Sequence, residues 1–109
     1  MVNKPTPSRS LPLDNLIDLT CNVVGVDRVA FDLHPKKRGP AFARKLLSRV
    51  WVEDYGRTQL EMARLMSTDP AIVSRWRTRA LQQFAEQHDA LAELRERLPE
   101  IERSIELAS

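Results

Sequence analysis

The sequence has few of the residues on which β-sheets and disulfide-linked folds depend. Three of its 109 residues are glycine, and the dipeptides Asn-Gly and Asp-Gly, which favour tight β-hairpins, do not occur. No stretch alternates apolar and polar residues as a half-buried strand does. The single cysteine, Cys21, excludes an intramolecular disulfide. These absences predict an all-α fold.

Long apolar segments are also missing. No apolar run approaches the length of about 18 residues that a membrane-spanning helix needs. Residues 1–10 contain two prolines and lack the apolar core of a signal peptide, so we expect a flexible tail and a cytoplasmic protein. Cys21 lies among Leu19, Val23 and Val24. We interpret it as a small buried apolar residue, with a reactive thiol as the alternative.

The motifs of common catalytic and metal sites are absent as well. His34 and His88 are far apart in the sequence, and no Cys or carboxylate cluster has the spacing of metal ligands. The sequence contains no phosphate-binding loop and no nucleophile motif. We therefore expect neither an enzyme nor a bound cofactor. For Trp51 and Trp76 we expect packing in the core, with stacking on bases as the alternative.

The charged residues are unevenly distributed along the chain. The net charge is +2, but residues 34–81 hold 11 basic and four acidic residues, which gives this segment a charge of +7. Residues 1–33 sum to −1 and residues 82–109 to −4. A strongly basic middle between acidic ends is typical of a local nucleic-acid-binding surface.

Apolar residues recur at steps of three and four, which predicts a bundle of about five to six helices. Gly25 and Gly56 follow two of these helices, at the place where a left-handed residue usually ends a helix. The expected helices cover residues 12–25, 28–33, 40–55, 59–66 and 70–98, and a last helix covers 99–107 after the interruption at Pro99.

Capping residues support several of these helix starts. Asp27 can cap the second helix, and Thr58 with Glu61 forms a capping box at the fourth. Thr68 or Asp69 can cap the fifth, which opens with a proline. The boundaries therefore rest on local chemistry as well as on periodicity.

Residues 58–79 have the pattern of a helix-turn-helix, with a short helix, a tight turn and a second helix. Ala63 is small enough to let the two helices approach closely. The turn at 66–69 has the required length but lacks the usual glycine. We expect the apolar seam between the helices to consist of Leu60, Leu65, Ile72, Val73 and Trp76.

The second helix of such a motif places its N-terminal end in the major groove of DNA. Arginine pairs well with guanine there, and cations further along the helix suit phosphate contacts. A loop before the third helix adds three adjacent cations. The expected DNA-binding residues are Lys36, Lys37, Arg38, Arg44, Lys45, Thr68, Asp69, Ala71, Ser74, Arg75, Arg77 and Arg79.

Three stretches within residues 14–79 follow a known order: Val-Val-Gly-Val-Asp, then Lys-Lys-Arg leading into Ala-Phe-Ala-Arg, then Asp-Pro-Ala-Ile-Val-Ser-Arg. On these motifs the chain resembles the C-terminal DNA-binding domain of the bacterial replication initiator DnaA, and the related domain that ends some REP-associated transposases. The resemblance implies a TrpR-like helix-turn-helix. It also implies that Lys36, Lys37 and Arg38 reach the minor groove while the helix after the turn reads the major groove.

The last part of the chain continues the helical periodicity, with the spacing of a coiled coil. Its apolar and semi-apolar positions are Leu81, Phe84, His88, Leu91, Leu94, Leu98, Ile101, Ile105 and Ala108. Two interpretations are open, since this extension can pack on its own domain or join two copies of the chain. The expected organisation is a tail at 1–10, a helix-turn-helix domain at 11–80 and a helical extension at 81–109.

The sequence thus predicts a protein that binds specific sequences of double-stranded DNA and is nucleoid-associated when bound. We expect a regulatory role or an accessory role for a mobile element or phage, and a homodimer through residues 81–108. Two alternatives are a helical module that binds an acidic protein partner and a small terminase-like subunit of a phage packaging machine.

Overall fold

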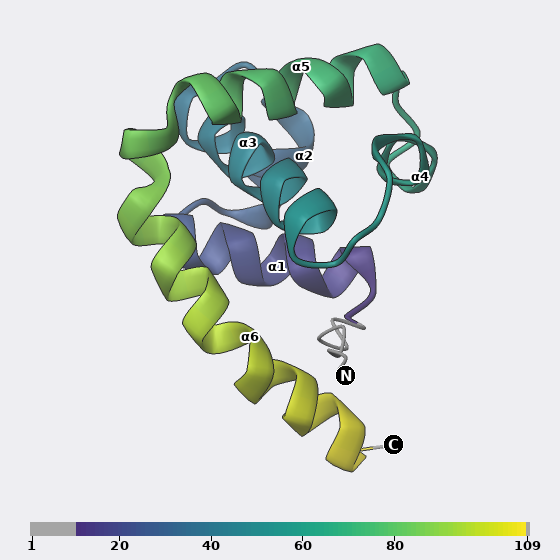
Figure 1. The fold of residues 1–109 in the computed structure, drawn as a ribbon, viewed down its shortest axis with the longest axis vertical. Helices are drawn as coiled ribbons and strands as arrows, with labels where there is room; N and C mark the ends of the chain where they lie inside the picture. Colours follow the sequence, from purple (N-terminus) through teal and green to yellow (C-terminus); the bar gives the residue numbers. More distant parts are fainter. Residues whose placement is uncertain (1–10, 109) are drawn as a thin grey trace, which may run out of the picture.

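The computed structural model describes the backbone of residues 11–108 and the side chains of residues 11–103; the tail predicted for residues 1–10 lies outside this part. Within it the chain forms six α-helices and no strand, so the all-α prediction is confirmed (Figure 1). None of these helices is long and apolar enough to cross a membrane. The helices are α1 (Leu13–Val24), α2 (Arg28–Leu33), α3 (Arg38–Glu53), α4 (Gln59–Leu65), α5 (Pro70–Gln82) and α6 (His88–Ala108), with a 3-10 turn at Phe84–Gln87 before α6.

Helix α3 is the centre of the domain: α1, α2, α4 and α5 pack around it, and α6 packs on α1 (Figure 1). Its residues Leu46, Leu47 and Val50 are fully buried, and α1 contributes Leu16 to the same core. Helix α5 crosses one side of α3, and α1 lies on the other side. Burying apolar side chains in this way is the main stabilising contribution to a helical domain of this size.

The predicted ends of α1 and α2 are confirmed. Gly25 has a φ of 82°, and its amide donates to the Cys21 carbonyl at 2.8 Å. Asp27 caps α2 by accepting a hydrogen bond from the Val29 amide at 3.3 Å. Cys21 is buried, as expected for a small apolar residue. These local signals were sufficient because each acts within one turn of the helix end.

The caps of α4 and α5 are confirmed as well. Thr58 Oγ1 accepts from the Glu61 amide at 3.1 Å, and Asp69 Oδ1 accepts from the Ala71 amide at 2.8 Å. The buried Trp51 donates from Nε1 to the Thr58 carbonyl at 3.0 Å, so α3 holds the start of α4 in place. The expectation that Trp51 packs in the core is therefore correct.

The turn between α4 and α5 works without glycine. Ser67 adopts a φ of 54°, the left-handed conformation that a glycine usually supplies. Its amide donates to the Arg64 carbonyl at 3.2 Å, and the Thr68 amide donates to the Ala63 carbonyl at 2.9 Å. These two bonds close the end of α4 and fix the angle at which α5 begins.

The predicted seam between α4 and α5 is only partly correct. Val73 is fully buried and Ala63 nearly so, and the fully buried Met62 was not predicted. By contrast, Leu60, Leu65 and Ile72 are exposed, with relative exposures of 48%, 59% and 36%. A helix of only two turns presents one narrow face to its neighbours, and in α4 that face carries Met62 and Ala63 rather than the leucines beside them.

The single helix predicted for residues 70–98 is wrong. Helix α5 ends at Gln82, and the chain turns through Phe84–Gln87 before α6 starts in a new direction (Figure 1). Gln87 is fully buried, and its Nε2 donates to the carbonyl of Ala80 at 3.0 Å and to that of Gln83 at 3.3 Å. One buried amide thus satisfies carbonyls at the end of α5 and stabilises the change of direction.

The interruption predicted at Pro99 is also wrong, because α6 runs through it to Ala108. A proline inside a helix costs about 3 kcal/mol. Here it is exposed, while Leu94 and Leu98 on the other side of the helix are fully buried. Packing of this apolar face against the domain offsets the missing hydrogen bond.

Helix α6 packs back on α1, and this interpretation of the extension is correct for its first half. Leu91, Leu94 and Leu98 belong to the same core as the residues of α1. Arg97 Nη1 donates to the Asn22 side chain at 2.9 Å across the same contact. These three leucines are therefore used within the chain itself.

Candidate nucleic-acid interface

A groove between the loop before α3 and the outer face of α5 gathers basic side chains from three segments. Among the described residues it is lined by the cations Lys36, Arg44, Lys45, Arg75 and Arg79, and by no carboxylate. We call this depression the basic groove. Its composition suits an anionic ligand, because nothing among its lining residues neutralises the positive charge.

The cations at the edges of the basic groove are free to meet a ligand. Lys36 comes from the loop, and Arg75 and Arg79 lie one turn apart on α5; all three are exposed. Thr68, just before α5, is half-buried and lines the same groove. Two segments that are far apart in the sequence therefore present one charged surface.

Arg44 lies in the protein interior rather than at the exposed surface where a DNA contact was expected. Its guanidinium carbon is 4.3 Å from the centre of the Phe31 ring and 5.1 Å from that of Trp76, and Nη2 donates to the Phe31 carbonyl. Burial lowers the pKa of this guanidinium, although an arginine stays protonated at physiological pH. Arg44 thus joins α2, α3 and α5 beneath the groove.

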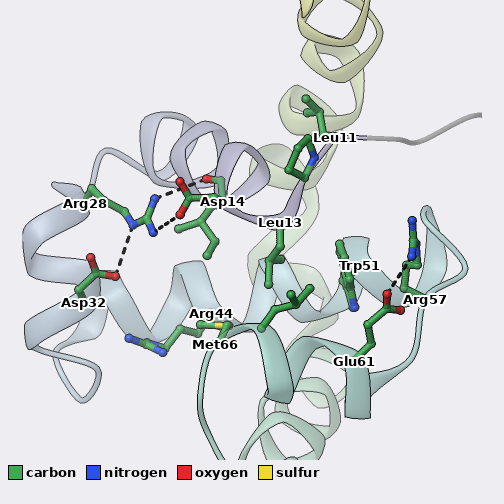
Figure 2. A pocket seen from close by; sticks show the side chains of 13 residues that line it. Leu11, Leu13, Asp14, Arg28, Asp32, Arg44, Trp51, Arg57, Glu61 and Met66 are labelled. Carbon is green, nitrogen blue, oxygen red and sulfur yellow. Dashed lines mark hydrogen bonds and ion pairs between the residues drawn. The ribbon is translucent and has the colours of Figure 1, made fainter.

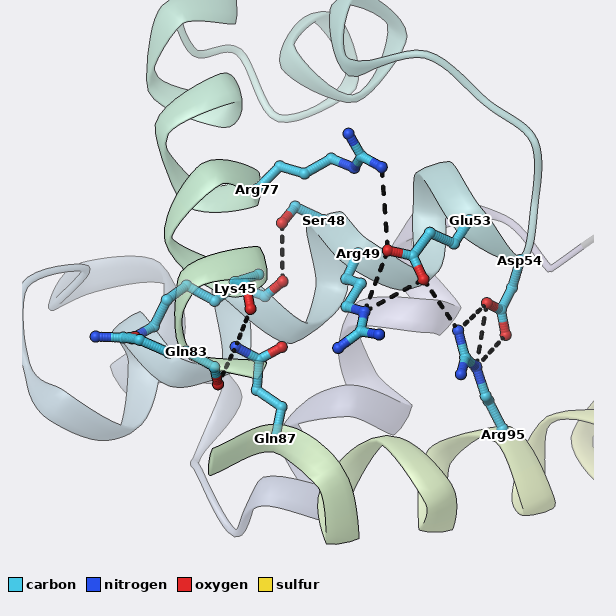
Figure 3. A network of polar contacts seen from close by, with 10 residues as sticks. Lys45, Ser48, Arg49, Glu53, Asp54, Arg77, Gln83, Gln87 and Arg95 are labelled. Atoms are coloured by element: carbon cyan, nitrogen blue, oxygen red, sulfur yellow. Dashed lines mark hydrogen bonds and ion pairs between the residues drawn. The ribbon is translucent and has the colours of Figure 1, made fainter. Parts of the chain in front are cut away.

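Lys45 and Arg77, two other expected contacts, have partners inside the protein (Figure 3). Lys45 Nζ donates to Gln83 Oε1 at the end of α5. Arg77 faces Glu53 of α3, with 4.0 Å between Nη2 and Oε2. Both side chains therefore hold α5 against α3.

Figure 3 also shows how the same network reaches α6. Arg49 Nε lies 3.1 Å from Glu53 Oε2, and Arg95 Nη2 of α6 lies 2.7 Å from Asp54 Oδ1. The hydrogen bonds that Arg95 donates to Asp54, followed by the charges of Asp54 and Glu53, raise the pKa of Arg95 against the effect of burial. The end of α3 is thereby connected to both α5 and α6.

The three cations of the predicted loop do not share one surface. Lys37 occupies the N-cap position of α3 without a capping hydrogen bond from its side chain, and Arg38 is the first residue of the helix, so α3 begins two residues before the predicted Pro40. Lys36 lines the basic groove, whereas Arg38 lines a separate depression that also contains Phe42 and Glu86. The remaining expected residues Asp69, Ala71 and Ser74 are exposed near the start of α5.

A second pocket, between α1, α3 and α4, has a different electrostatic character (Figure 2). Arg28 lies 2.7 Å from Asp14 and 3.3 Å from Asp32, and Arg57 lies 2.8 Å from Glu61. Arg28 and Arg57 are thus paired with carboxylates in the pocket itself, and the buried Arg44 lines this pocket as well as the basic groove. This pocket therefore contains charges of both signs, whereas the described lining of the basic groove contains no carboxylate.

Six residues that line the basic groove are absent from the predicted site: Pro35, Ala41, Met66, Ser67, Ile72 and Trp76. Ile72 was assigned to the buried seam, but it is partly exposed and lines the groove. A usable signal exists in its spacing, since Ile72 precedes Arg75 by three residues and Arg79 by seven and therefore shares their face of α5.

No protein-family model, no curated protein and no solved structure significantly matches this chain. Among the described residues, no group of three or more His, Cys, Asp or Glu side chains could hold a metal ion. What the structure establishes is a compact all-helical domain with a groove on one side whose described lining residues include five cations and no carboxylate.

Proposed function

We propose that this protein binds double-stranded DNA sequence-specifically, with α4 and α5 acting as a helix-turn-helix. The observation that carries the proposal is the basic groove, in which cations of α5 and of the preceding loop lie together without a carboxylate. Phosphates supply the anions that such a surface attracts, and they dominate the affinity of proteins for DNA.

The geometry of α5 supports its role as the recognition helix. Its 13 residues span about 20 Å, and a B-DNA major groove about 12 Å wide admits a helix. The first turns expose Ala71, Ser74 and Arg75. In this proposal Arg75 and Ser74 face base edges, while Arg79 and Lys36 contact phosphates on either side.

The order of the helices supports the finer part of the proposal, a domain like the C-terminal domain of DnaA or of REP-associated transposases. In the family a basic loop and the helix after the turn act together on one duplex. Here Lys36 and Arg75 line one groove, as this arrangement requires. We propose a regulatory role, or an accessory role for a mobile element or phage.

The first experiment measures binding of the full chain to a fluorescent random duplex by anisotropy at several salt concentrations. We expect binding at low salt that weakens steeply as salt rises, because bound phosphates release counterions. Selection from a random duplex pool then yields the preferred site. Absence of binding at low salt would contradict the proposal and favour a module that binds an acidic protein, whereas a ring-sized mass in solution would favour a packaging subunit.

A matched pair of variants assigns the binding to the groove. Lys36→Ala and Arg103→Ala each remove one exposed cation, but Arg103 lies on α6, which runs away from α5 (Figure 1). We expect Lys36→Ala to weaken binding to random duplex and to lower its salt dependence, while Arg103→Ala leaves both close to those of the wild type. Equal effects of the two substitutions would show that the affinity for DNA depends only on the net charge of the protein.

A further inference from the structure

The basic groove contains an apolar element that phosphate binding does not explain. Ile72 is 36% exposed in the first turn of α5, on the face that also carries Arg75 and Arg79. Met66 and Trp76 line the same groove. The groove therefore has a small apolar patch, and basic side chains lie around it.

A duplex offers few groups that match such a patch. Phosphates present anionic oxygens to a bound protein, and the base edges in the major groove are mostly hydrogen-bond donors and acceptors. The exception is the C5-methyl group of thymine, which projects into the major groove and is contacted by apolar side chains. Ile72 stands near the helix end that would enter that groove.

We propose that Ile72 determines specificity by contacting the C5-methyl group of a thymine in the target site. This inference rests on the proposed function, because it requires α5 to lie in the major groove. Contact with one methyl group contributes about fourfold to affinity, since burial of such a group is worth about 0.8 kcal/mol. The contact of Ile72 affects which base is preferred, whereas the surrounding cations raise the affinity for all DNA sequences alike.

The test uses the full chain and the duplex selected from the random pool. Each thymine of that duplex is replaced singly by deoxyuridine, which removes the methyl group and leaves the hydrogen-bonding groups in place. We expect at least one thymine at which the replacement weakens wild-type binding about fourfold. Ile72→Ala should bind the thymine and deoxyuridine duplexes with equal affinity at that position.

Two control variants separate this contact from other effects. Leu60→Ala truncates an exposed apolar residue of α4 outside the groove, and should keep the fourfold preference for thymine. Lys36→Ala should weaken binding to both duplexes by the same factor. Thermal melts of all variants should stay close to that of the wild type, because each changed residue is exposed.

The outcomes distinguish this inference from the proposed function. If the chain binds no duplex DNA, or binds DNA but selects no sequence, both fail. If it selects a sequence but discriminates at no thymine, or keeps its preference in Ile72→Ala, the proposed thymine contact is wrong while the proposed function stands. Loss of discrimination in Ile72→Ala but not in Leu60→Ala supports the contact.

Discussion

Arginines two positions apart on α5 show that residue type alone does not define a role. Arg75 is exposed at the edge of the basic groove, whereas Arg77 is half-buried beside Glu53. Arg44, on α3, lies between two aromatic rings. The same guanidinium thus serves as a free cation, an ion-pair partner or a packing element, according to the helix face on which it lies.

We predict that Arg75→Ala reduces affinity for the selected site by about 1–3 kcal/mol and relaxes base choice at one position, because an arginine can pair with both acceptors of a guanine. Binding of the selected site and of its single-base variants, followed by anisotropy, measures both effects. The same loss on specific and random duplexes would show that Arg75 contacts phosphate only.

We predict a pH-dependent loss of stability that originates at Cys21. Burial raises the pKa of its thiol from 9.0 to about 11. The unfolded chain therefore loses this proton first, so the stability that the protonated thiol contributes is complete below pH 9 and is lost as the pH rises towards 11. The expected loss is on the order of 2 kcal/mol, since each pKa unit corresponds to about 1.4 kcal/mol.

Urea unfolding of the wild type and of Cys21→Ala at several pH values tests this prediction. The variant lacks the titrating group, so its free energy of unfolding should decrease less between pH 9 and pH 11. Parallel curves for the two proteins would show that other groups cause the alkaline loss.

At the scale of helices and loops, features that depend on residues close together in the sequence could be predicted, and features that depend on distant residues could not. The caps at Asp27, Thr58 and Asp69 act within one turn, and all three are present in the structure. The break between α5 and α6 depends on Gln87 reaching the carbonyl of Ala80, a contact that no periodicity reveals. The seam was misassigned for a similar reason, because the neighbours of α4 decide which of its faces is buried.

The sequence was sufficient to predict which segments supply the cations of the candidate site, but not which of these cations are exposed on one surface. Exposed cations from the loop and from α5 do line one groove, as the charge distribution suggested. Whether Arg44, Lys45 and Arg77 were free could not be predicted, because their partners Phe31, Gln83 and Glu53 come from other parts of the chain.

For the loop before α3, we predict that replacing Lys36, Lys37 and Arg38 together with alanine weakens binding to all duplexes. Each lost phosphate contact lowers the slope of log affinity against log salt by about 0.9. Since Arg38 lines a different depression, we expect the slope to fall by about one or two contacts. Arg38→Ala alone should leave it nearly unchanged, and an unchanged slope in the triple variant would remove the loop from the interface.

At the scale of the whole molecule, α6 belongs to the fold. We predict that Leu94→Ala destabilises the protein by about 2–5 kcal/mol, because it leaves a cavity in a fully buried position. Leu60→Ala removes the same atoms from a site on α4 that is 48% exposed and should cost much less. Denaturant unfolding measures the loss of stability in both variants. A loss for Leu94→Ala as small as that of the exposed control would mean that α6 is not part of the core.

Self-association through residues 81–108 stays a prediction. The structure leaves fewer exposed apolar residues in this segment for a contact between two copies. Of the described apolar positions, Leu81 and Phe84 remain about half-exposed, while Leu91, Leu94 and Leu98 are buried. We expect sedimentation equilibrium to give twice the 12.5 kDa of one chain, and Leu81→Ser to shift the protein towards that single mass. If the wild-type protein has the mass of a single chain at all concentrations tested, the predicted dimer is wrong.

The way α5 is anchored has a thermodynamic consequence. Its own residues Val73 and Ala80 are fully buried, and its end is joined to α3 by the hydrogen bond from Lys45 to Gln83. A helix held at both ends is ordered before any partner arrives, so association costs little backbone entropy. The heat-capacity change of a complex formed through α5 would then reflect only the apolar surface removed from water, without the large additional decrease that accompanies coupled folding.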